Sequence, residues 1–155
     1  YKDGVQQVIL NGENVTSLLR TEETGKMASK TSKYAEVRTK LVALQRGLAK
    51  KTDVIMDGRD IGTTVLPDAF AKIYLTASSD ARAKRRYDEL KEKGENCSFD
   101  AIKEDIEKRD YEDMHRAISP LKQADEAVLV DTSDMNIEQV VAALSKIIDE
   151  KKAGR

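Results

Sequence analysis

Residues 53–63 read DVIMDGRDIGT, a short apolar run that ends in a charged turn. An apolar run of this length is typical of a strand buried on both faces, and the Asp57-Gly58 pair marks its end. Open parallel α/β sheets bind their ligands beyond the carboxyl ends of the strands. We therefore expect a strand at residues 53–56, with the charged turn 57–60 at a ligand-binding edge.

Strands and helices alternate along the rest of the chain. Apolar residues spaced three or four apart predict a helix from Tyr34 to Leu48, and the Asn11-Gly12 turn predicts a hairpin that begins with a strand at 5–10. Further elements are predicted as strands at 70–75 and 127–130, and as helices at 78–94, from 98 onward and at 136–151. This alternation predicts an α/β fold with a parallel sheet and flanking helices, although three core strands are few for such a sheet.

Composition limits the classes of partner. A chain of 155 residues fits one domain with a real core. Its 27 basic and 28 acidic residues nearly cancel, so we expect no nucleic-acid partner, and without a long apolar run we expect no membrane partner. The single cysteine, Cys97, excludes an intramolecular disulfide and fits a cytoplasmic protein. We also expect a monomer.

The turn at 57–60 has the chemistry of a phosphate site. Gly58 permits close approach of a ligand to the backbone, and Arg59 offers a planar fork for a phosphate. Asp57 could hold the water shell of Mg²⁺. The spacing alone leaves open a plain Asp-Gly turn flanked by solvated charges.

Two further groups of charged residues lie downstream. Arg109, Asp113 and Arg116 are separated by four and three residues, so on a helix they project from one face and form a plausible phosphate clamp. The alternative is an ordinary surface ion pair, which contributes about 0.2–0.5 kcal/mol. The second group, at 82–86, is basic and without alternating aromatic residues, which favours a solvated helix face unless it closes over a ligand.

Taken in order, these pieces resemble bacterial cytidylate kinases, and the resemblance covers nearly the whole chain. The matching runs are 57–63 (DGRDIGT), 75–78 (LTAS), 85–86 (RR) and 109–116 (RDYEDMHR). The resemblance implies the fold of a P-loop nucleoside monophosphate kinase. It also implies transfer of the γ-phosphoryl group of ATP to CMP or dCMP, with Mg²⁺ bridging the phosphates.

The resemblance also implies site residues. The cytosine would be read by Ser29, Arg38 and Asp60, whereas the CMP phosphate would be held by Arg59. Arg109 and Asp113 would contact sugar and phosphate, and Arg116 would reach the transferring group, so that the catalytic arginines would be Arg59, Arg109 and Arg116.

A lid over ATP would correspond to residues 82–116. Its ATP-facing residues would be Arg82, Arg85 and Arg86, and Asp57 would be the indirect metal contact. Residues 1–35 would be part of the insert that binds the nucleoside monophosphate, and residues 36–155 the α/β core.

One departure from the family is large. The Gly-x-x-x-x-Gly-Lys-Ser/Thr loop that holds ATP does not occur in this sequence, because its one Gly-Lys pair, Gly25-Lys26, lacks the earlier glycine and precedes Met27. We therefore expect that the chain lacks the first strand and P-loop of the family and is inactive alone. A non-catalytic nucleotide-binding module, and a related kinase with another base specificity, remain alternatives.

Overall fold

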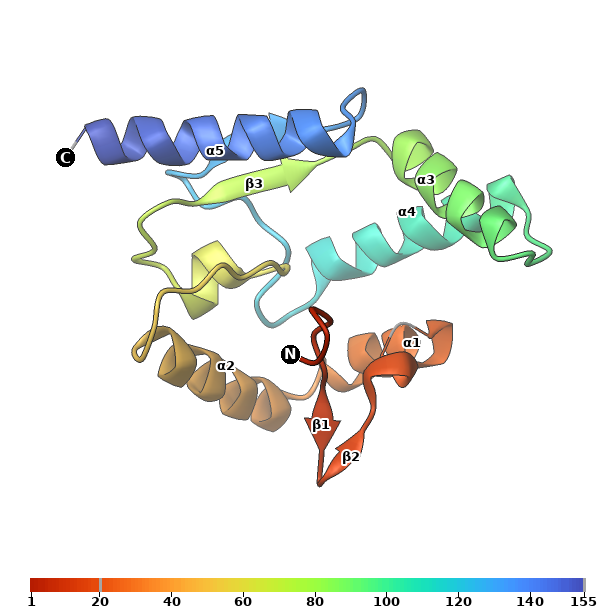
Figure 1. Cartoon of the computed structure of the whole chain (residues 1–155), viewed down its shortest axis with the longest axis horizontal. Coiled ribbons are helices and arrows are strands. Elements are labelled where there is room, and N and C mark those ends of the chain that lie inside the picture. Colours follow the sequence, from red (N-terminus) through yellow and green to blue (C-terminus); the bar gives the residue numbers. More distant parts are fainter. Residues whose placement is uncertain (20, 155) are drawn as a thin grey trace. The chain divides into compact units, whose positions relative to one another are not determined.

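The computed structural model describes residues 1–19 and 21–154, which form two compact units. The first spans residues 1–45 and the second begins at Arg46 (Figure 1). The division of function between residues 1–35 and 36–155 stays a prediction.

The first unit opens with the predicted hairpin. Strands β1 (Ile9–Leu10) and β2 (Glu13–Asn14) pair antiparallel across a two-residue loop. In that loop Asn11 has a φ of 51° and Gly12 a φ of 87°. Positive φ at both positions is what a type I′ turn requires, and Asn-Gly supplies it at little steric cost. The hairpin is confirmed, but β1 has two residues rather than the six predicted at 5–10.

Two helices follow the hairpin and a short 3₁₀ turn at Thr16–Leu18. Helix α1 (Glu22–Thr31) was not predicted, and it begins after Thr21, whose side chain accepts a hydrogen bond from the backbone N–H of Thr24 at 3.2 Å. Helix α2 (Ala35–Ala49) confirms the prediction from Tyr34 to Leu48. The apolar side chains of α2 that defined this prediction are largely exposed.

The second unit contains a two-stranded parallel sheet. Strands β3 (Ile73–Thr76) and β4 (Val128–Asp131) pair in register, with Ile73 opposite Val128. They correspond to two of the three predicted strands and confirm the parallel arrangement.

The predicted strand at 53–56 is wrong for this structure. The segment is not part of any sheet, and the side chain of Ile55 is almost fully exposed. A strand is defined by the hydrogen bonds that it makes with a neighbour. Within the described residues no other segment pairs with 53–56, so its apolar sequence alone does not make it a strand.

Three long helices complete the second unit, and the predicted start of each is confirmed. Ser78, Ser98 and Asn136 each cap a helix with a side-chain oxygen, and Asn136 forms a full capping box with Gln139. Gly94 follows the first of these helices with a φ of 76°, a left-handed conformation that favours glycine. The helices are α3 (Ser79–Glu92), α4 (Phe99–His115) and α5 (Ile137–Ala153).

Helices α3 and α4 pack on each other as a helical hairpin (Figure 1). The buried apolar core of the described residues is small, and its side chains are Val65, Ala77, Ala83 and Val130. None of the described helices is long and apolar enough to span a bilayer.

Candidate functional site

The charged turn 57–60 is held in place by local packing. A Cβ atom on Gly58 would lie 2.9 Å from Cγ1 of Ile61, so a larger residue would force Ile61 to move. A single π-helical turn, Ile61–Val65, starts directly after Asp60. The backbone oxygen of Asp60 accepts hydrogen bonds from the N–H groups of Thr64 at 2.8 Å and Val65 at 3.2 Å. The backbone at Asp60 is therefore fixed by the turn that follows it.

Asp113 is the centre of the candidate site. This carboxylate is buried, and its Oδ2 accepts a 3.0 Å hydrogen bond from Nε of Arg59, which is 54 positions away in the chain. Nη1 of Arg116 lies 3.6 Å from Oδ1, and Nε of Arg109 lies 4.0 Å from Oδ2. One carboxylate therefore faces three guanidinium groups, and the charged turn meets α4 at this point.

Arg116 connects Asp113 with Asp60. Its Nη2 lies 4.0 Å from Oδ1 of Asp60, and both side chains are nearly buried. The prediction of a single helix face holds only in part, because α4 ends at His115 and Arg116 has an extended backbone. Nε of Arg116 donates a 2.6 Å hydrogen bond to the backbone oxygen of Ser119, which directs the guanidinium back toward α4.

We call these five residues, Arg59, Asp60, Arg109, Asp113 and Arg116, the arginine cluster. Three positive charges and two negative charges leave it with a net charge of +1. The side chains of Arg59 and Arg109 are 44% and 56% exposed, so both can contact a ligand from solvent. Guanidinium groups bind phosphate oxygens with paired N–H donors, and the cluster is therefore suited to a phosphate.

The predicted lid residue Arg82 joins α3 to α4. Its Nη1 and Nη2 donate hydrogen bonds to the two carboxylate oxygens of Asp110, at 2.9 and 2.6 Å. Its Nε donates to the backbone oxygen of Ala77 at 3.0 Å. The hydrogen-bonded Asp110 carboxylate raises the pKa of Arg82 above its ordinary value. Sequence reasoning missed Asp110, since nothing in its spacing indicated a partner on α3.

The other two predicted lid residues are bonded elsewhere. Arg85 donates to the backbone oxygens of Thr132 and Met135, in the loop that joins β4 to α5. Arg86 pairs with Glu89 on its own helix at 2.9 Å. Hydrogen bonds from Lys93 and then Arg86 lower the pKa of Glu89 to about 2. Arg86 is thus the only one of the three whose described bonds stay within α3.

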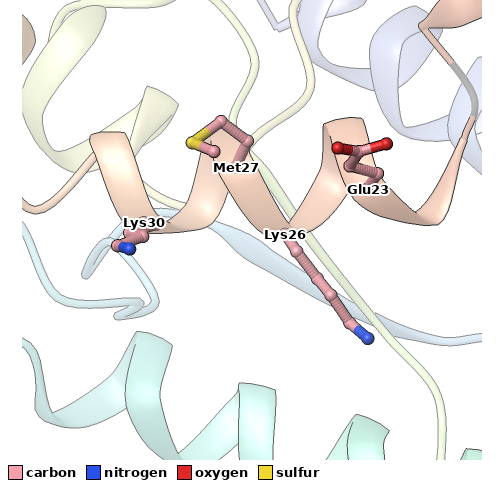
Figure 2. Close-up of a pocket in the computed structure, with 4 residues that line it drawn as sticks. All are labelled: Glu23, Lys26, Met27 and Lys30. Carbon is pink, nitrogen blue, oxygen red and sulfur yellow. The ribbon is translucent and has the colours of Figure 1, made fainter.

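The predicted base-reading residues of the first unit are Ser29 on α1 and Arg38 on α2, both half-buried. A depression of about 460 Å³ on α1 is lined by Glu23, Lys26, Met27 and Lys30, whose side chains are labelled in Figure 2. Ser29 does not line it. The roles of Ser29 and Arg38 stay predictions.

The described residues offer limited support for a metal. Asp57 is exposed beside Gly58, and within residues 1–19 and 21–154 no three His, Cys, Asp or Glu side chains gather in a metal-binding group. Mg²⁺ at phosphates keeps several waters and needs only one or two carboxylates from the protein. The exposed carboxylate of Asp57 leaves room for such a contact through water, and its role stays a prediction.

Comparison with known proteins decides the family. The cytidylate kinase family model matches residues 2–150. The chain belongs to the cytidylate kinase family. It is 51% identical over 151 residues to the cytidylate kinase of Lactobacillus johnsonii, with 97% of this chain and 66% of that protein covered. It is 50% identical to the enzyme of Leuconostoc mesenteroides and 46% identical to that of Thermosipho melanesiensis, each matched over 65% of its length.

Membership of this family confirms the resemblance drawn from 57–63 and 109–116, and with it the fold class of a P-loop nucleoside monophosphate kinase. The chain spans about 66% of the length of the first of these relatives. The small parallel sheet with flanking helices is consistent with part of that fold.

Proposed function

We propose that this chain carries the acceptor-binding and lid parts of a cytidylate kinase, which in the intact enzyme transfers the γ-phosphoryl group of ATP to CMP or dCMP. The observation that carries the proposal is the contact of Arg59 and Arg116 with the buried carboxylate of Asp113. This contact joins residues 57–63 to residues 109–116, two of the runs that resemble the family.

The arginine cluster would bind the phosphate of CMP. Arg59 and Arg109 are the exposed members, so their guanidinium groups would contact the phosphate oxygens directly. Asp113 would hold the three arginines in a common orientation and could also accept a hydrogen bond from a sugar hydroxyl. Arg116, which is nearly buried, would stabilise negative charge on the transferring group from a fixed position.

Phosphoryl transfer needs positioning and charge neutralisation rather than a covalent nucleophile, and arginines supply both. Bound Mg²⁺ would supply positive charge to neutralise the charge that develops on the phosphates. Asp57 would contact its water shell. Of the predicted lid residues, Arg86 would turn toward ATP most easily, because its described bonds lie within one exposed helix.

Base recognition follows from the pattern of donors and acceptors on cytosine. Cytosine presents an amino donor beside a ring nitrogen and a carbonyl acceptor, whereas uracil presents a carbonyl in place of the amine. Asp60 would accept from the amine, while Ser29 and Arg38 would serve the acceptors. Because only the carboxylate distinguishes the amine from a carbonyl, Asp60 is the proposed specificity residue.

Calorimetric titration of this chain with CMP and UMP tests the assignment. Asp60→Asn introduces an amide that can both donate and accept, so the ratio of CMP to UMP affinity should fall by about tenfold, the equivalent of one hydrogen bond to a charged group. Asp68→Asn is a matched control, since Asp68 lies outside the arginine cluster. An unchanged ratio in Asp60→Asn would rule out its role in reading the base.

We further propose that the 155-residue polypeptide has no kinase activity alone, because its sequence contains no loop for the phosphates of ATP. A coupled assay with ATP and CMP would show no turnover above background, and measurable turnover would refute this part. A non-catalytic nucleotide-binding module is the alternative, and CMP binding without turnover in a longer protein that contains a P-loop would favour it.

We propose a monomeric enzyme of the cytoplasm, in keeping with its single cysteine, Cys97. Equilibrium sedimentation of the chain would test the monomer, and a concentration-dependent mass would contradict it.

A further inference from the structure

Arg46 lies in the last turn of α2, where it has no predicted role. Its guanidinium contacts the π-helical turn after Asp60, which lies almost twenty residues later in the chain. Nε donates a 2.9 Å hydrogen bond to the backbone oxygen of Val65, and Nη2 donates a 2.6 Å bond to the backbone oxygen of Thr64. Two donors of one planar group thus hold two successive carbonyl groups.

These carbonyl groups belong to the residues that fix the backbone of Asp60. The N–H groups of Thr64 and Val65 donate to the backbone oxygen of Asp60, while their own oxygens accept from Arg46. Thr64 and Val65 are therefore hydrogen-bonded through both backbone groups, with their N–H groups to Asp60 and their carbonyl oxygens to the guanidinium of Arg46. Val65 is also the largest fully buried side chain of the described residues, so the turn is anchored at its far end.

The near end of the turn packs beside Gly58. The side chain of Ile61 occupies the space where a Cβ atom on Gly58 would come within 2.9 Å of its Cγ1, and Asp60 lies between these two residues in the chain. If Arg46 released the carbonyl groups of Thr64 and Val65, the turn would keep only its internal hydrogen bonds. Asp60 would then lose part of the support for its backbone, although its carboxylate would still face Arg116.

We propose that Arg46 is a positioning residue for Asp60, and that it acts through the π-helical turn Ile61–Val65. The assignment of Asp60 to cytosine recognition belongs to the proposed function, on which the nucleotide part of this inference rests. Arg46 does not contact the nucleotide. It preserves the geometry that separates CMP from UMP.

The arrangement requires the planar fork of arginine. Lysine at position 46 would reach the turn with a single ammonium group and could hold one carbonyl group well but not both in the same geometry. Arg46→Ala removes both bonds, and Arg46→Lys should restore part of the effect. Lys50→Ala is a suitable control, because Lys50 follows Arg46 by one helical turn and is exposed.

The first measurement is amide hydrogen exchange in the 155-residue chain without nucleotide. In Arg46→Ala the N–H groups of Thr64 and Val65 should exchange about tenfold faster than in the unsubstituted chain, as expected when a local opening loses hydrogen-bond support. The N–H group of Thr132, which follows β4 and donates to the backbone oxygen of Thr76 at the end of β3, serves as the reference. Equal acceleration at Thr132 would indicate general destabilisation and would overturn the positioning role, as would unchanged exchange at Thr64.

The second measurement is the ratio of CMP to UMP affinity by calorimetry. Arg46→Ala should lower this ratio about fivefold, a smaller change than Asp60→Asn because the carboxylate remains present. Arg46→Lys should give an intermediate ratio and Lys50→Ala the original one. An unchanged ratio in Arg46→Ala would refute the link to specificity. If the unsubstituted chain binds neither nucleotide, the proposed function fails, while the exchange result still decides whether Arg46 holds Asp60 in place.

Discussion

Replacing Asp113 by asparagine tests the centre of the arginine cluster. The substitution keeps the size of the side chain and one oxygen that can accept from Nε of Arg59, but it removes the negative charge that faces three arginines. The net charge of the cluster then rises from +1 to +2. We expect a less stable protein, because positive groups that were paired are left facing one another.

The size of the effect follows from exposure. A hydrogen bond to a charged group contributes about 1.5–3 kcal/mol, and breaking a fully buried ion pair costs about 3–5 kcal/mol. The Arg59 side chain is about half exposed, so water compensates part of its loss, whereas Arg116 is nearly buried and is not compensated. We expect Asp113→Asn to lower the free energy of unfolding by about 2 kcal/mol. For Arg109→Gln, whose contact is exposed and 4.0 Å long, we expect less than about 0.5 kcal/mol.

Urea unfolding followed by far-ultraviolet circular dichroism measures both variants. The double variant Arg59→Gln/Asp113→Asn completes a thermodynamic cycle, and its coupling energy should be about 1 kcal/mol and exceed that of the Arg109–Asp113 pair. The reasoning would be refuted if Asp113→Asn and Arg109→Gln had equal effects on the free energy of unfolding, because the 3.0 Å contact would then carry no more energy than the 4.0 Å contact.

Two further predictions concern the surface. Glu89 has a pKa of about 2 in the folded chain against an ordinary 4.5, so its contribution to stability is present above pH 4.5 and is lost as the pH falls toward 2. The difference in thermal midpoint between the unsubstituted chain and Glu89→Gln should therefore shrink over that range. A difference that stays constant with pH would contradict the pairing of Glu89 with Lys93 and Arg86. Ile55→Lys should change the free energy of unfolding by less than about 0.5 kcal/mol relative to the unsubstituted chain, because the Ile55 side chain is 99% exposed. The same substitution should reduce both aggregation and the binding of a hydrophobic dye. A loss of stability comparable to that of a Val65→Ala variant would show that Ile55 is buried in solution.

Local sequence signals predicted helices α2 to α5 and the hairpin turn, but they did not predict α1. The caps at Ser78, Ser98 and Asn136 and the Asn11-Gly12 turn depend on neighbouring residues alone, so the sequence contains all that is needed to identify them. The strand predicted at 53–56 failed for the opposite reason. Pairing of a strand depends on a partner elsewhere, and an apolar run does not say whether that partner is present.

The candidate site shows the same division. The spacing of Arg109, Asp113 and Arg116 indicated that they would meet, although Arg116 reaches the group from beyond the end of α4. The bond from Arg59 to Asp113 joins residues 54 positions apart, and no pattern within either segment predicts it. It came within reach only through the family resemblance, which brings both segments to one site. Arg46 was missed altogether, because a single arginine near a helix end gives no indication of which carbonyl groups it will bind.

The pairing of Arg82 with Asp110 has a mechanical consequence. Two parallel N–H···O bonds resist twisting as well as separation, and Lys103 with Asp80 adds a second connection between α3 and α4 at 2.8 Å. These bonds hold α3 and α4 together as one hairpin, and the bond from Arg82 to the backbone oxygen of Ala77 attaches that hairpin to the residue after β3. Arg109 belongs to the same helix as Asp110, so a rigid-body rotation of the hairpin would carry the guanidinium of Arg109 with it and change its distance from Arg59, which lies outside the hairpin.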